Sequence, residues 1–158
     1  MSGSLNFGIR ISGRQASDTF PAWQPVRLWV EVEMSDEPYR IEFTSHPNYL
    51  HVYVAGKEDS VEISRQYWTE AVAEAKRLGL KRLLVEEDIE VDAPATAHFE
   101  FAKELQEIAG TDIVIAFVDR HAQHDPLNRF AEVVATNRGI KATVFNTTDD
   151  AAAWLTGT

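Results

Sequence analysis

The 158-residue chain contains no cysteine, which excludes disulfide bonds, thiol nucleophiles and zinc sites built on cysteine. Its longest strongly apolar run, Ile113–Val118, is six residues long, far below the roughly 20 that a membrane-spanning helix needs. The N-terminus also lacks the continuous apolar segment of a signal peptide. We therefore expect a soluble, cytoplasmic protein without a membrane span.

Basic residues are scarce as well, with 15 Lys and Arg against 25 Asp and Glu and a net charge of −10. A field of that sign repels phosphate backbones and anionic membrane surfaces, so we expect no nucleic-acid partner. Residues 1–33 have no net charge, so all of the excess negative charge follows them. This change of composition predicts an N-terminal extension over residues 1–33 and a domain over residues 34–158.

The extension is rich in turn-forming residues, and within it only Val26–Val32 alternates as an edge strand would. The segment that follows begins Met34-Ser35-Asp36-Glu37-Pro38, which resembles a fresh start of a chain. One hypothesis is therefore that translation begins at Met34. Mass spectrometry of the N-terminus of protein from its native source would decide this.

From Tyr39 the hydrophobic pattern becomes regular, and short strand patterns alternate with helical ones. The predicted strands are Tyr39–Phe43, Tyr49–Ala55, Arg82–Val85, Asp112–Val118 and Lys141–Phe145. The order of elements is β-β-α-β-α-β-α-β-α. Strands separated by helices imply right-handed crossovers, so we predict an α/β fold with a mostly parallel sheet of four to five strands.

Local signals mark the ends of the predicted helices. Three of the helices stop at a glycine, namely Gly79, Gly110 and Gly139. Asp59, with a glutamate three residues later, predicts a capping box at the start of the first helix. Asp125 before a proline, and Thr147 before two aspartates, predict the N-caps of the last two helices.

The C-terminal part of this pattern resembles a known family. The segment Val134-Ala135-Thr136-Asn137-Arg138-Gly139, the strand Ala142–Phe145 and the helix Ala151–Leu155 are similar to the STAS superfamily, and more closely to its SpoIIAA-like, or STAS/SEC14-like, branch. The likeness covers roughly Tyr39 to Leu155. It implies a small STAS-like domain that is mostly non-enzymatic and binds proteins or small ligands.

In the anti-sigma-factor antagonists of that superfamily, a phosphorylatable serine lies in an Asp-Ser-Ser-Gly-type turn that opens the helix after the central strand. The matching region here, Val91–Ala97, contains neither a serine nor a pair of glycines. Thr96 carries the nearest hydroxyl and is the candidate phosphoacceptor that the resemblance suggests.

Two polar clusters follow the predicted central strands, where ligands of parallel sheets usually bind. The first cluster contributes Glu86, Asp92 and His98 as candidate ligand-binding residues. The second lies in the segment Asp119–Asp125 and contributes three more, namely Asp119, His121 and His124. The alternative interpretation is a pair of solvated loops in which Asp125 caps a helix.

His121 and His124 also form a candidate metal site, because imidazole with a nearby carboxylate gives ligands suited to zinc or another transition metal. The same loops would allow a small-molecule or metal-assisted enzyme. Against this, the chain has no Gly-rich phosphate loop and no G-x-S-x-G nucleophile elbow.

The sequence therefore predicts a non-enzymatic binding or regulatory module that interacts with a protein partner or a small ligand and needs no cofactor. Phe101 and Trp154 have the spacing of core residues, whereas Tyr67 and Trp68 adjoin on a helix and cannot both point squarely into one core. Packing is the ordinary interpretation of these aromatic residues. Alternatively, an apolar groove or a homodimer interface would use them.

Overall fold

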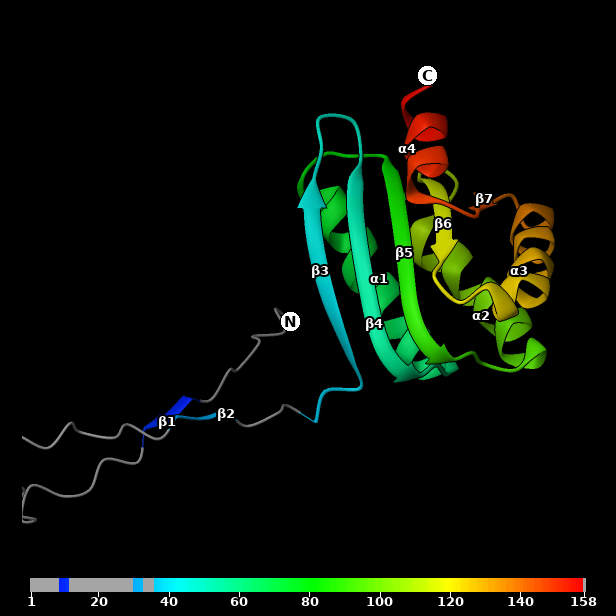
Figure 1. Ribbon diagram of the computed structural model, residues 1–158. Coiled ribbons are helices and arrows are strands. Elements are labelled where there is room, and N and C mark those ends of the chain that lie inside the picture. The colour runs from blue at the N-terminus through cyan, green and yellow to red at the C-terminus, as the bar shows by residue number, and fades with distance from the viewer. Residues whose placement is uncertain (1–8, 12–29, 33–35, 158) are drawn as a thin grey trace, which may run out of the picture. The chain divides into compact units, whose positions relative to one another are not determined.

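The computed structural model describes residues 9–11, 30–32 and 36–157 (Figure 1). The chain divides into two units, Met1–Glu37 and Pro38–Thr158. In the first unit, β1 (Ile9–Ile11) and β2 (Val30–Val32) pair with each other antiparallel. Residues 26–29 of the predicted edge strand, Met34 and the predicted boundary after residue 33 lie outside the described residues.

A five-stranded sheet forms the centre of the second unit (Figure 1). In spatial order its strands are β3 (Tyr39–Ser45), β4 (Leu50–Glu58), β5 (Arg82–Val91), β6 (Val114–Asp119) and β7 (Lys141–Phe145). β3 pairs antiparallel with β4, and all other neighbours are parallel. The predicted α/β fold, with its order of elements, is confirmed.

Four α-helices cover the two faces of this sheet. They are α1 (Val61–Arg77), α2 (Ala95–Ala109), α3 (Asp125–Asn137) and α4 (Thr148–Thr156). A 3-10 turn, η1 (Ala122–His124), precedes α3. Helices α1, α2 and α3 pack side by side on one face, which we call the inner face, whereas α4 packs on β5, β6 and β7 from the opposite, outer face. Among the described residues, no helix is long and apolar enough to cross a membrane.

The main core lies on the inner face, where alternate residues of the strands meet α1 to α3. Val52 of β4, Val85 of β5 and Ile115 of β6 are at most 1% exposed there. The intervening residues, such as Leu84 and Ala116, meet α4 in a smaller cluster. Because side chains alternate along a strand, each central strand contributes to both layers.

The predicted helix stops are confirmed. Gly79 and Gly139 follow α1 and α3 with φ angles of 69° and 80°. A side chain at such a φ angle is strained, which explains why glycine occupies both positions. The cap of α4 is confirmed as well, since the Thr147 hydroxyl accepts a hydrogen bond from the Asp150 backbone N–H.

Two predicted caps are wrong. Ser60, not Asp59, caps α1, and its hydroxyl accepts from the Ile63 backbone N–H at 3.2 Å. Asp125 is the first residue of α3 and His124 is its N-cap. The buried Asp59 carboxylate does not cap α1 because it accepts hydrogen bonds from the Ser64 hydroxyl, at 2.9 and 3.0 Å.

The predicted end of the third strand at Val85 is also wrong, because β5 continues to Val91. The acidic residues Glu86–Asp88 therefore lie inside a central strand and not in a loop beyond it. Their backbone pairs with Tyr53–Ala55 of β4 on one side and, for the first two, with Val118 and Asp119 of β6 on the other. Backbone pairing with both neighbours keeps Glu86–Asp88 in the strand, although three consecutive acidic residues are unusual in a buried strand.

Candidate functional site

Strand alternation separates the three consecutive carboxyl groups of β5. Glu87 lies on the inner face with Val85, whereas Glu86 and Asp88 lie on the outer face with Leu84. Polar side chains therefore gather on both sides of one strand. We call the inner site the inner pocket and the outer group, which comprises His51, Tyr53, Glu86, Asp88, Arg120 and His121, the outer cluster.

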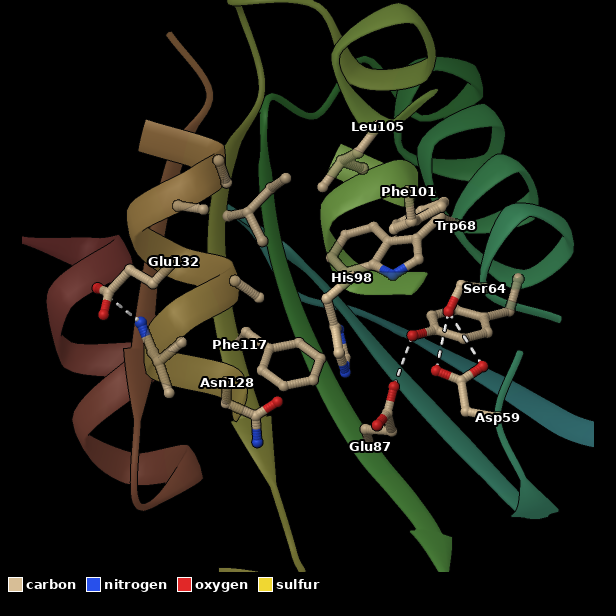
Figure 2. A pocket seen from close by; sticks show the side chains of 16 residues that line it. Asp59, Ser64, Trp68, Glu87, His98, Phe101, Leu105, Phe117, Asn128 and Glu132 are labelled. Atoms are coloured by element: carbon tan, nitrogen blue, oxygen red, sulfur yellow. Dashed lines mark hydrogen bonds between the residues drawn. The ribbon is translucent and has the colours of Figure 1, made fainter. Parts of the chain in front are cut away.

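The inner pocket is a cavity of about 80 Å³ between the sheet and helices α1, α2 and α3 (Figure 2). Most of its wall is apolar, and the aromatic rings of Trp68, Phe101 and Phe117 form much of it. The rings of Trp68 and Phe117 are nearly parallel, with centroids 6.3 Å apart. Sequence reasoning placed Trp68 and Phe101 in the core, and the structure shows that they also line this pocket.

Polar groups meet the pocket near the carboxyl ends of β4 and β5. The Tyr67 hydroxyl donates to Glu87 Oε2 at 2.5 Å. Asp59, just after β4, accepts from the Ser60 backbone N–H at 2.8 Å and from the Ser64 hydroxyl. Figure 2 shows Glu87, Asp59 and Ser64 gathered at one end of the pocket. Glu87 and Asp59 are only 3% and 6% exposed, so both carboxyl groups are removed from solvent.

Burial raises the pKa of Glu87 well above its ordinary value, and the nearby Asp59 carboxylate raises it further. The hydrogen bond from Tyr67 opposes this shift without cancelling it. Burial likewise raises the pKa of Asp59, although the hydrogen bonds from Ser64 and Ser60 lower it. Burial and the neighbouring carboxylate therefore favour the uncharged form of the Glu87 carboxyl group.

His98 and Asp92, two of the predicted site residues, lie together. His98 Nε2 is 2.9 Å from Asp92 Oδ1, and the His98 ring lines the inner pocket. Burial alone lowers the pKa of His98, but the hydrogen bond and charge of Asp92 outweigh it and leave the pKa raised. Asp92 Oδ2 is buried and has no hydrogen-bond partner among the described residues.

Arg120 is the centre of the outer cluster. Its Nε donates to Glu86 Oε1 at 2.6 Å, its Nη1 is 3.7 Å from Asp88 Oδ2, and its guanidinium lies 4.8 Å from the centre of the Tyr53 ring. His51 Nε2 is 2.8 Å from the other oxygen of Glu86. Both oxygens of Glu86 are thus occupied by protein partners.

Asp88 is occupied in the same way. The Tyr53 hydroxyl donates to Asp88 Oδ2 at 2.7 Å, and His121 Nε2 is 2.9 Å from Asp88 Oδ1. The hydrogen bond from Tyr53, together with those of His121 and the charge of Arg120, lowers the pKa of Asp88 below its ordinary value. The outer cluster therefore stabilises an ionised carboxylate.

Asp119 holds the loop between β6 and α3. Its Oδ1 accepts from the His121 backbone N–H at 2.8 Å, and its Oδ2 lies 3.0 Å from His124 Nδ1 and 2.9 Å from Asn128 Nδ2. Of the predicted second cluster, the structure thus brings Asp119 and His124 together, while the His121 ring contacts Asp88 instead. Each histidine has a carboxylate partner.

The predicted metal site at His121 and His124 gains no support from this geometry. Their rings are 5.3 Å apart. Within the described part of the chain, however, no group of three or more His, Asp or Glu side chains is placed to hold a metal ion. The metal site stays a prediction.

Thr96, the candidate phosphoacceptor, is exposed in the first turn of α2. Pro94 precedes the helix as its N-cap and offers no side-chain hydrogen bond. The structure thus leaves the Thr96 hydroxyl accessible at the start of the helix that follows β5. Its phosphorylation stays a prediction.

Sequence reasoning missed Glu87 and Asn128 as pocket residues and did not connect His51 or Tyr53 with Glu86 and Asp88. One signal was available for Glu87, because strand alternation continued past Val85 would have placed it on the core face. The partners from β4 follow from the strand register, in which Tyr53 pairs with Glu86. A single sequence does not reveal that register.

No family model matches the sequence, and no curated protein matches it. Among solved structures, an anti-sigma factor antagonist from Mycobacterium paratuberculosis aligns over 75% of this chain and 94% of its own, with a TM-score of 0.51 and 15% identity. An uncharacterized DUF3478-family protein with a SpoIIAA-like fold, from Shewanella loihica PV-4, aligns over 77% of this chain and 98% of its own, with a TM-score of 0.49 and 16% identity. The first similarity shows that the chain has a STAS-like fold, as predicted.

Proposed function

We propose that this domain is a binding module that takes a small ligand into the inner pocket and does not convert it. The observation that carries the proposal is a mostly apolar cavity with a few buried polar groups at one end. Small-molecule sites commonly combine apolar walls with a small number of placed polar groups. The position at the carboxyl ends of parallel strands also suits a ligand site.

The polar groups of the pocket support binding more than catalysis. The Ser64 hydroxyl donates to both oxygens of Asp59, and His98 Nε2 contacts Asp92, so Ser64 is not paired with the histidine of the pocket. Glu87 bonds with the Tyr67 hydroxyl. These polar side chains are thus held by one another, which supports recognition more than turnover.

The experiment is a comparison of the wild-type chain with a variant whose pocket is filled. Ala131 lines the pocket, so Ala131→Leu places extra methyl groups inside it, whereas Ala122→Leu adds the same groups at an exposed position. Native mass spectrometry of the purified full chain, followed by a thermal-shift screen of small fragments, reports binding. We expect bound or stabilising compounds for wild type and Ala122→Leu and none for Ala131→Leu. Equal responses from all three proteins would contradict the proposal.

A protein partner is the second candidate function. The structural neighbour from Mycobacterium paratuberculosis is an anti-sigma factor antagonist, and Thr96 is exposed at the start of α2, where the family resemblance places a phosphoacceptor. A phosphate in the first turn would be stabilised by the helix dipole. Phosphopeptide analysis of protein from the native source tests this. An unmodified Thr96 under all growth conditions would rule out this switch, and the native mass spectrum also reports any homodimer.

The alternative of metal-assisted chemistry depends on His121 and His124. A metal that binds only the folded state must raise the melting temperature. Zinc or nickel is therefore added to the wild type and to His124→Gln. The absence of a metal-dependent rise in the wild type would exclude this alternative.

A further inference from the structure

Two atoms in the inner pocket are left for a ligand. Glu87 Oε2 accepts from Tyr67, but the described residues give Glu87 Oε1 no hydrogen bond. Asn128 Nδ2 donates to Asp119 Oδ2, and since an ionised carboxylate only accepts, this bond fixes the orientation of the amide; the described residues give its Oδ1 no hydrogen bond. Both side chains line the pocket and are at most 4% exposed.

The surroundings of Glu87 decide which hydrogen bond it offers. Neither lysine nor arginine is among the described residues that line the pocket, and the ring of His98 is held by Asp92. A buried carboxylate without a cationic partner is far less stable than a neutral carboxyl group. Because Tyr67 donates to Oε2, a proton carried by Glu87 would lie on Oε1 and make that oxygen a donor.

We infer that the ligand of the inner pocket is an uncharged molecule whose hydroxyl or amide group accepts a hydrogen bond from Glu87 and donates one to Asn128. This inference rests on the proposed binding function and specifies its ligand class. The rest of the molecule is apolar, because Trp68, Phe101 and Phe117 would surround it. The volume of about 80 Å³ restricts it to a short or compact frame.

The probes are four compounds with one carbon frame and different polar ends: isobutanol, isobutyramide, isobutyrate and isobutylamine. Each is titrated near neutral pH into the ¹⁵N-labelled full chain. The reporter is the indole N–H signal of Trp68, which lines the pocket, and the signal of Trp154, which contacts Phe145 on the outer face, is the internal control.

We expect isobutanol and isobutyramide to shift the Trp68 signal saturably and to leave Trp154 unchanged. The charged isobutyrate and isobutylamine should bind at least about tenfold more weakly, since each ion loses its hydration and the charged groups of the pocket, Asp59 and His98, are already held by Ser64 and Asp92. Tighter binding of the amine or the acid would overturn the inferred ligand class but leave the binding function intact. A Trp68 signal that none of the four compounds shifts would overturn both.

Variants of Glu87 separate recognition from folding. Glu87→Gln keeps a neutral hydrogen-bonding group, so alcohol binding should stay within about threefold of wild type. Glu87→Met keeps a side chain of similar size but removes the hydrogen-bond donor, so it should weaken isobutanol binding about tenfold. Glu86→Gln, one residue away on the other face, should bind isobutanol as wild type does. Unchanged binding by Glu87→Met would overturn the assignment of Glu87 as the donor.

Discussion

On the outer face of β5, Glu86 and Asp88 both contact Arg120, whereas on the inner face Glu87 contacts the Tyr67 hydroxyl. The three residues are consecutive, yet their environments have opposite effects. The pKa of Asp88 is lowered, chiefly by the hydrogen bond from Tyr53, and that of Glu87 is raised, chiefly by burial. The difference shows that position across the sheet decides which form of a carboxyl group is favoured, the ionised form of Asp88 on the outer face and the uncharged form of Glu87 on the inner face.

The two faces also differ in what their polar groups contribute to stability. The Arg120 side chain is 52% exposed, so its ion pairs are screened by water and contribute at most about 1 kcal/mol each. Glu87 lies in an apolar pocket, where an ionised carboxylate would be strongly destabilising. The outer cluster thus lies at a partly solvated surface, while Glu87 in the inner pocket is removed from solvent.

The largest expected difference in stability between the two faces concerns the two tryptophans Trp68 and Trp154. Trp68 is 5% exposed in the inner pocket and Trp154 is 42% exposed on the outer side. Trp68→Ala should lower the free energy of unfolding by about 3–5 kcal/mol, because a large buried side chain is lost. Trp154→Ala should cost less than half of that. Urea denaturation measures both, and equal losses would show that the inner face is not the main core.

The next effect concerns Glu87 and alkaline pH. The pKa of Glu87 is higher in the folded state than in the unfolded state. At pH values between these two pKa values the folded state binds more protons than the unfolded state, so the protein loses stability as the pH rises through this range. Glu87→Gln removes this group and should be more stable than wild type at about pH 9. At about pH 5 the two should differ little. A parallel loss of stability in both proteins from pH 5 to 9 would contradict a neutral Glu87.

The matched change on the outer face should have the opposite sign. Glu86→Gln weakens the hydrogen bonds that Arg120 and His51 make with an ionised acceptor. We expect a loss of about 1 kcal/mol at neutral pH, reduced in high salt because the cluster is partly exposed. Chemical denaturation with and without added salt measures it. A stabilised Glu86→Gln would mean that the outer cluster does not favour ionised carboxylates.

The smallest expected change in stability concerns Asp88 and its dependence on acidic pH. The pKa of Asp88 is lower in the folded state than in the unfolded state. The ionised side chain therefore stabilises the fold at pH values above the unfolded-state pKa, and this stabilisation is lost as the pH falls through the folded-state pKa. Asp88→Asn should therefore be slightly less stable than wild type at neutral pH and equal to it in strong acid. Because the side chain is 30% exposed, the difference should be small. A difference that persists at the lowest pH would point to lost packing in place of lost charge.

Much of the fold could be predicted because its signals are local. The stops at Gly79 and Gly139 and the cap at Thr147 each depend on a few neighbouring residues, and the alternation of strands and helices gave the order of elements. The end of β5 could not be predicted in this way. Three consecutive acidic residues favour a loop on composition, and only cross-strand partners keep Glu86–Asp88 inside the sheet.

The candidate site was predicted only in part for the same reason. His98 with Asp92, and Asp119 with His124, are close in the chain, and both pairs form. The contact between His51 and Glu86 joins residues on neighbouring strands and depends on the register of β4 against β5. The residues next to His51 and Glu86 in the sequence do not indicate that these two side chains meet.

The sequence by itself determined the α/β class, the glycine stops of the helices and the exclusion of cysteine chemistry, because these follow from composition and short-range pattern. The tertiary structure decided which face of β5 receives each carboxyl group. It also decided that Glu87 faces an apolar pocket and Asp88 an arginine. The physical reason is that the charge of a carboxyl group depends on its solvent access and its neighbours, and both are set by strand register and helix packing.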